Sequence, residues 1–150
     1  MLFRSVLTRA QTKEFVGILG AERQRRGRTE IAAHRALQFA AGSGPPYRCE
    51  AGRGLVTVLS DGGICPCRRM PTVVGSVWGA GLAETYCDSA VMRCLRDRAE
   101  PARGCEGCFY SRTCGGGLRC LAAAVHGDAF VADPGCWLAR ERTPLDQGGL

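Results

Sequence analysis

Histidine and lysine are scarce in this sequence, and long apolar runs are missing. Of the 150 residues, two are histidines and one, Lys13, is a lysine. No apolar run approaches the ~20 residues needed to cross a bilayer, so we expect no membrane partner. The first residues lack a continuous apolar core of signal-peptide length, which favours a cytoplasmic protein. No serine, histidine and carboxylate arrangement, phosphate loop or paired-carboxylate motif stands out from the background.

Cysteine, in contrast, is abundant, with ten residues in the chain. Disulfides bring little benefit in a reducing compartment, so metal ligation is the better explanation for so many thiols. The net charge of +6 at pH 7 is carried almost entirely by arginine. We interpret this charge as a solvated face of the protein and expect no nucleic-acid partner.

The N-terminal third predicts short helices. Thr8 followed by Gln11 is a capping-box pattern, and apolar residues at helical spacing then predict a helix over about 9–19, which Gly20 interrupts. A second short helix is expected from Thr29 and should end at the glycine- and proline-rich segment 42–46.

The rest of the chain predicts a hairpin and further helices, so that the expected fold class is α+β. The apolar runs 55–59 and 64–67 flank an Asp-Gly pair, which favours an antiparallel hairpin. Amphipathic spacing predicts a helix over about 82–98, and an alanine-rich stretch predicts another over 118–125. Cys87 and Cys94 lie on the first of these helices, and we interpret them as buried structural thiols.

Four thiols fall within the stretch 105–120. Cys105 and Cys108 form a Cys-x2-Cys pair, in which the two intervening residues can turn both sulfurs towards one ion or one cluster corner. Cys114 and Cys120 follow in the same stretch. The spacing leaves the metal open, because zinc prefers a closed tetrahedron of four ligands, whereas an iron–sulfur cubane takes one thiolate at each iron.

The cysteines and the residues between them resemble the SPASM domain, found at the C-terminal end of radical S-adenosylmethionine (SAM) enzymes that mature peptides and proteins. The family pattern is a cysteine, a spacer, Gly-x4-Cys, a gap, Cys-x2-Cys-x5-Cys-x3-Cys, a gap and a final cysteine. The matching residues are Cys49, Gly62, Cys67, Cys105, Cys108, Cys114 and Cys136. The Asp-Gly, Gly-Asp and Asp-Pro-Gly-Cys sequences at 61–62, 127–128 and 133–136 also match, and the resemblance covers about residues 47–140.

This resemblance implies one or two auxiliary 4Fe-4S clusters on a scaffold of a hairpin and helices. The implied ligands of the second cluster are Cys105, Cys108, Cys114 and Cys136, and those of the first include Cys49 and Cys67. The sixth cysteine of the pattern falls at Leu118, and the nearest thiol is Cys120, two residues on. In a helix two residues turn a side chain by about 200°, so Cys120 would point away from the direction of a side chain at 118. Cys65 is another candidate ligand. A structural or peptide-binding module stapled by zinc is the alternative.

The function implied by the resemblance is electron transfer and substrate positioning for a SAM-binding barrel that acts on a peptide or protein. The barrel's Cys-x3-Cys-x2-Cys spacing does not occur here, so we do not expect this chain alone to cleave SAM. Residues 1–46 resemble the last helices of such a barrel, 47–140 the SPASM domain, and 141–150 a tail. The chain is expected to be a truncated enzyme or an accessory subunit.

Overall fold

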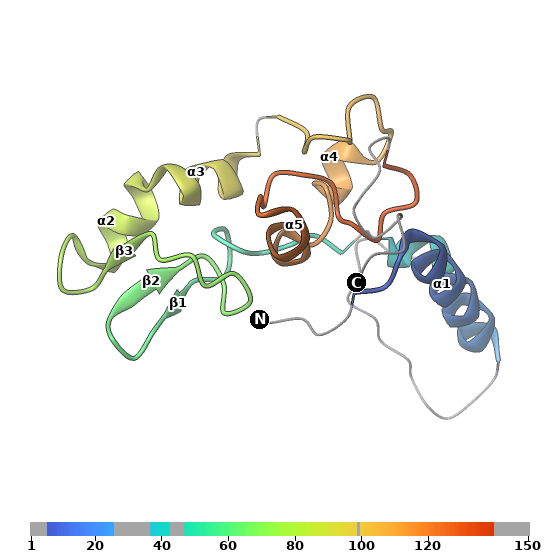
Figure 1. Ribbon diagram of the computed structural model, residues 1–150, viewed down its shortest axis with the longest axis horizontal. Coiled ribbons are helices and arrows are strands. Elements are labelled where there is room, and N and C mark those ends of the chain that lie inside the picture. The colour runs from blue at the N-terminus through green and yellow to red at the C-terminus, as the bar shows by residue number, and fades with distance from the viewer. Residues whose placement is uncertain (1–5, 26–36, 43–46, 99, 140–150) are drawn as a thin grey trace. The chain divides into compact units, whose positions relative to one another are not determined.

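A computed structural model of the protein describes residues 6–25, 37–42, 47–98 and 100–139, and its fold is α+β as predicted. Its contacts divide the chain into two compact units (Figure 1). Unit 1 comprises Met1–Cys49 and Pro101–Leu150, and unit 2 comprises Glu50–Glu100. No helix within the described residues is both long and apolar enough to cross a membrane.

Unit 1 begins with the helix α1, Arg9–Gln24. The predicted capping box is present, because the Thr8 side chain accepts the Gln11 amide and the Gln11 side chain accepts the Thr8 amide. The predicted interruption at Gly20 is wrong. Gly20 lies within α1. A Cβ at this position would lie 3.3 Å from the carbonyl oxygen of Ala41, so glycine allows the segment that carries Ala41 to approach the helix closely.

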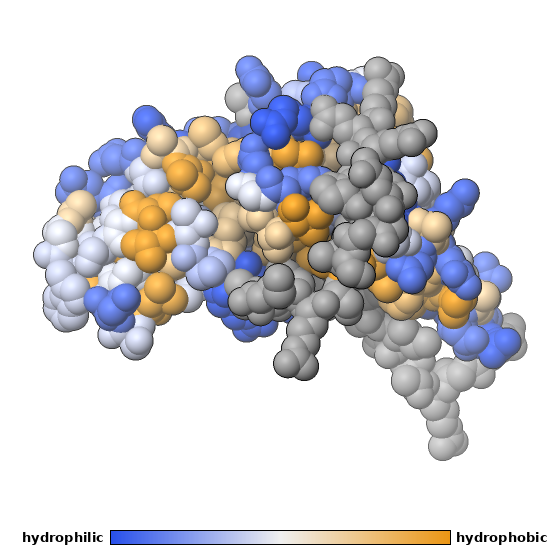
Figure 2. Space-filling view, in the orientation of Figure 1, coloured by the Kyte–Doolittle hydropathy of each residue, from blue (hydrophilic) through white to orange (hydrophobic). Residues whose placement is uncertain are grey.

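The face of α1 that packs inward consists of Thr12, Val16 and Leu19. Val16 and Leu19 form a small core with Ala41, and Trp137 packs against it. Ala41 ends the 3-10 helix η1, Gln38–Ala41. Figure 2 shows hydrophobic and hydrophilic residues interspersed along α1. Phe15 and Ile18 of this helix are exposed. The helix predicted from Thr29 falls mostly on 26–36, outside the described residues.

Two further helices of unit 1 lie in the cysteine-rich part. The short helix α4 spans Ser111–Cys114, and α5 spans Arg119–His126. The helix predicted over 118–125 is thereby confirmed, and it ends at Gly127 in the left-handed conformation. The short helix α4 was not predicted, because four residues are too few to produce a helical apolar period.

Unit 2 contains a three-stranded antiparallel sheet in the order β1-β2-β3. The strands are β1, Thr57–Val58, β2, Gly63–Cys65, and β3, Gly75–Ser76. The predicted hairpin is confirmed, since Thr57 pairs with Cys65 across β1 and β2. The sequence gives no strand signal for β3 because Gly75 is a breaker residue. A Cβ on Gly75 would overlap the Thr85 side chain, so glycine allows β3 to lie close to Thr85.

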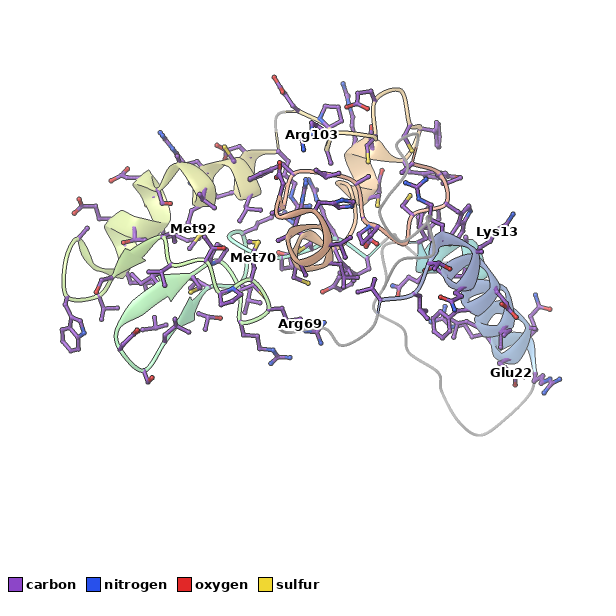
Figure 3. All side chains as sticks on the ribbon, in the orientation of Figure 1. Lys13, Glu22, Arg69, Met70, Met92 and Arg103 are labelled. Atoms are coloured by element: carbon purple, nitrogen blue, oxygen red, sulfur yellow. The ribbon has the colours of Figure 1, made fainter. Side chains whose placement is uncertain are left out.

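The helices of unit 2 are α2, Gly81–Asp88, and α3, Ala90–Asp97. The prediction of one continuous helix is wrong, because Ser89 has an extended backbone with φ −58° and ψ 124°. Met92 and Leu95 of α3 are fully buried, as is Ile64 of β2, and Met70 is nearly so. Figure 3 labels Met70 and Met92, whose flexible side chains fill this core.

Candidate metal centre

Three short segments of unit 1 carry the four cysteines assigned to the second cluster. Cys105 and Cys108 lie in the loop before α4, and the Cys108 amide donates to the Cys105 carbonyl at 3.1 Å, which closes a turn. The Glu106 carboxylate supports this turn by accepting the Gly104 amide at 2.9 and 3.1 Å. Cys114 ends α4, and Cys136 follows the turn that begins at Asp133.

These four thiols line one pocket, part of which is open to solvent. Apolar side chains of Leu37, Tyr110 and Leu138 complete much of its wall, together with Gly116 and Gly117. Its lining residues come from the loop before α4, from α4, from the glycine loop between α4 and α5, from the segment after α5, and from Leu37. The structure therefore brings together residues that are widely separated in sequence.

The thiols of the pocket influence one another electrostatically. The pKa of the Cys105 thiol is raised to about 12, first by burial and then by the three other thiols. The pKa of Cys114 is raised to about 11, chiefly by burial and next by Cys136. Because burial and neighbouring like charges both disfavour the thiolate form, cations bound between these thiols would favour their ionisation. Bound metal would supply those charges and deprotonate the thiols.

Backbone amides point at two of the sulfurs. Gly116 and Gly117 donate hydrogen bonds to Cys114, which partly offset the effect of burial on its pKa. Burial likewise raises the pKa of the Cys136 thiol, and hydrogen bonds from Leu138 and Ala139 partly offset this. Gly116 and Gly117 both have positive φ, 82° and 85°. Such a backbone favours glycine, and here it aims two successive amides at one sulfur.

Asp133 is a site residue whose role the sequence did not indicate. Its side chain is buried, with 5% of the residue exposed. One carboxylate oxygen accepts the Gly135 amide and the other accepts the Leu118 amide, each at 2.9 Å. The Asp133 amide in turn donates to the Gly116 carbonyl at 2.9 Å. Asp133 thus ties the loop that carries Cys136 to the glycine loop that follows Cys114.

The four pocket thiols are soft donors arranged around one pocket. Among the described residues, no three histidine, cysteine or acidic side chains are grouped so that they could hold one metal ion. In a 4Fe-4S cluster each thiolate binds a different iron, so the ligands surround a volume and do not converge on one point. Four soft thiolate donors around a pocket are of the type that such clusters use.

The residues assigned to the first cluster are distributed over both units. Cys49 and Cys120 are buried in unit 1, whereas Cys67 is half-buried in unit 2. The Cys67 sulfur accepts the amide of Arg69, labelled in Figure 3, at 3.4 Å. Leu118, at the position where the pattern has its sixth cysteine, is a buried apolar residue. The ligand set of this cluster stays a prediction.

Comparison with known proteins gives relatives of two kinds, although no family model matches the chain. The chain is 33% identical over 88 residues to an AdoMet-dependent heme synthase of Methanosarcina barkeri, covering 59% of this chain and 25% of the relative. It is 32% identical over 100 residues to a PqqA peptide cyclase of Methylobacterium nodulans, covering 63% and 26%. A PqqA peptide cyclase of Xanthomonas axonopodis is 30% identical over 106 residues, covering 67% and 27%. The chain thus spans about a quarter of the length of these relatives.

Proposed function

We propose that this chain is the auxiliary 4Fe-4S module of a radical SAM enzyme that modifies a peptide or protein, with Cys105, Cys108, Cys114 and Cys136 as the ligands of one cluster. The observation that carries the proposal is the single pocket lined by these four thiols. When bound, such a cluster supplies one-electron transfer. The chain's own residues hold it, shield it with apolar side chains and direct amides at its sulfur ligands.

The partners we propose are a SAM-binding barrel and a peptide or protein substrate. Two relatives support this class by name, one as AdoMet-dependent and another as acting on the peptide PqqA. Phe109, beside Cys108, is 90% exposed and lies edge-on to Tyr110, which lines the pocket. It offers an apolar contact for a substrate chain near the cluster.

We further propose that Cys49, Cys67 and Cys120 are ligands of a first cluster. We also propose that the protein is cytoplasmic.

Anaerobic reconstitution with iron and sulfide, followed by metal analysis, tests the proposal. We expect a brown protein that contains iron and has a broad absorption band near roughly 400 nm, as is usual for this cluster type. Cys108→Ala should lose iron because one iron of the cluster would lack its thiolate.

The matched control is Cys87→Ala, which removes an exposed thiol of unit 2. It should load iron like the unaltered protein. A colourless protein with stoichiometric zinc would refute the cluster and favour the zinc-stapled module. Equal loss of iron from both variants would show that the ligands are misassigned.

A further inference from the structure

Arg119 is a charged residue buried beside the candidate metal centre. It begins α5, and only 2% of it is exposed to solvent. Arginine stays protonated in proteins, so its guanidinium brings a positive charge into the interior of unit 1. A buried charge is costly unless an opposite charge or hydrogen bonds compensate for it.

The contacts of Arg119 compensate for this charge only in part. One terminal nitrogen, Nη1, donates to the Ala129 carbonyl at 2.9 Å, and the guanidinium carbon lies 5.5 Å from the centre of the Phe130 ring. The Nε atom is buried and has no hydrogen-bond partner among the described residues. Within that part of the chain Arg119 forms no ion pair with a carboxylate. The Asp128 carboxylate acts on it electrostatically but pairs with Arg103 at 3.1 Å.

The acidic groups that act on Arg119 are mainly cysteine thiols. Burial lowers the pKa of the guanidinium, and the ionised forms of Cys49, Cys105, Cys114 and Asp128 would oppose this change. The guanidinium also lies against Gly116, which lines the pocket, because a Cβ at Gly116 would be 3.6 Å from the guanidinium carbon. An orphaned N–H and an uncompensated positive charge are what an anionic group with sulfur acceptors would satisfy.

We propose that Arg119 is the buried counter-charge of the cluster held by the pocket thiols, and that it raises the cluster's reduction potential. The inference rests on the proposed function. An external one-electron reductant such as dithionite would add one electron to a bound cluster, with no bond made or broken. The reduced state therefore carries one more negative charge, which a fixed cation in a low-dielectric site stabilises more than it stabilises the oxidised state.

The test compares three arginine variants of the anaerobically reconstituted full chain. Arg119→Gln removes the charge and leaves a shorter, polar side chain, and Arg119→Lys keeps the charge. Arg103→Gln is the matched control, because it removes the same charge from an arginine whose side chain is 63% exposed and which Figure 3 labels. Iron content and the midpoint potential, from a redox titration followed by electron paramagnetic resonance, are measured for each.

We expect Arg119→Gln to hold iron and to show a midpoint potential lower by ~59 mV or more, which is a tenfold change in a one-electron equilibrium. Arg119→Lys should stay closer to the unaltered protein, and Arg103→Gln should shift little because water screens its charge. A variant Arg119→Gln with full iron content and an unchanged potential would overturn the inference while leaving the cluster itself intact.

Two other outcomes also decide the matter. If Arg119→Gln loses iron while Arg119→Lys retains it, the charge is needed to hold the anionic cluster, which supports the inference. If both variants lose iron alike, Arg119 acts through packing against Phe130 and the Ala129 carbonyl, and the inference fails. Absence of iron from the unaltered protein would instead refute the proposed function.

Discussion

Two aspartates of unit 1 sit in similar turns but have different importance for the candidate centre. Asp128 accepts the amide of Phe130, two residues on, and its other oxygen pairs with exposed Arg103. Asp133 likewise accepts the amide of Gly135, but its other oxygen accepts the distant, buried amide of Leu118. Only Asp133 therefore joins two loops that carry thiols.

Asp133→Asn should destabilise the protein by about 1–3 kcal/mol. An asparagine has one acceptor oxygen, so its NH2 group would face either the Leu118 or the Gly135 amide and leave a buried donor unsatisfied. Urea unfolding of the reconstituted protein measures the change. Asp128→Asn is the control and should cost less than about 1 kcal/mol, because it keeps the turn and loses one partly exposed ion pair. Similar losses of stability in both variants would mean that Asp133 does not connect the Cys136 loop to the glycine loop after Cys114.

The glycine loop between α4 and α5 determines how Cys114 is presented. Gly115, Gly116 and Gly117 all have positive φ, between 66° and 85°. A Cβ at Gly117 would overlap the side chain of Asp133. This loop therefore needs glycine for two reasons, the left-handed backbone and the close approach of the Asp133 loop.

Gly117→Ala should reduce stability and iron retention together, because alanine must either clash with Asp133 or move the amides that face Cys114. We expect a loss well above the ~1–2 kcal/mol of an alanine in the left-handed region alone. Gly127→Ala gives that baseline, since Gly127 has φ 71° and open space where a Cβ would lie. Thermal unfolding and iron content of the two variants make the comparison. Equal effects would show that the contact with Asp133 is unimportant.

Local sequence signals predicted the elements whose stability is local. The capping box located the start of α1, the Asp-Gly pair located the hairpin, and the alanine-rich stretch located α5. Features that depend on tertiary contacts were missed. The break at Ser89 has no proline or glycine to signal it, and Cys87 and Cys94 are exposed, not buried as expected.

The candidate site was predictable as a set of cysteines but not as a geometry. Spacing indicated that Cys105, Cys108 and Cys114 belong together, and the resemblance to a family added the distant Cys136. Neither could indicate that Asp133 connects the loops or that Arg119 is buried beside the thiols, because arginine and aspartate are usually surface or turn residues. Such residues become visible only through their burial and partners in the folded chain.

For the molecule as a whole, the most direct test is to count iron and acid-labile sulfide per chain after anaerobic reconstitution. The double variant Cys114→Ala/Cys136→Ala removes two thiols of the pocket, and Cys87→Ala/Cys94→Ala removes two exposed thiols of unit 2. Relative to the unaltered protein, we expect the pocket variant to lose about four iron and four sulfide, and the exposed-thiol variant to lose none, as a single 4Fe-4S cluster in the pocket requires. Unchanged iron and sulfide in the pocket variant, or metal without sulfide in the unaltered protein, would show that these four thiols do not hold a cluster.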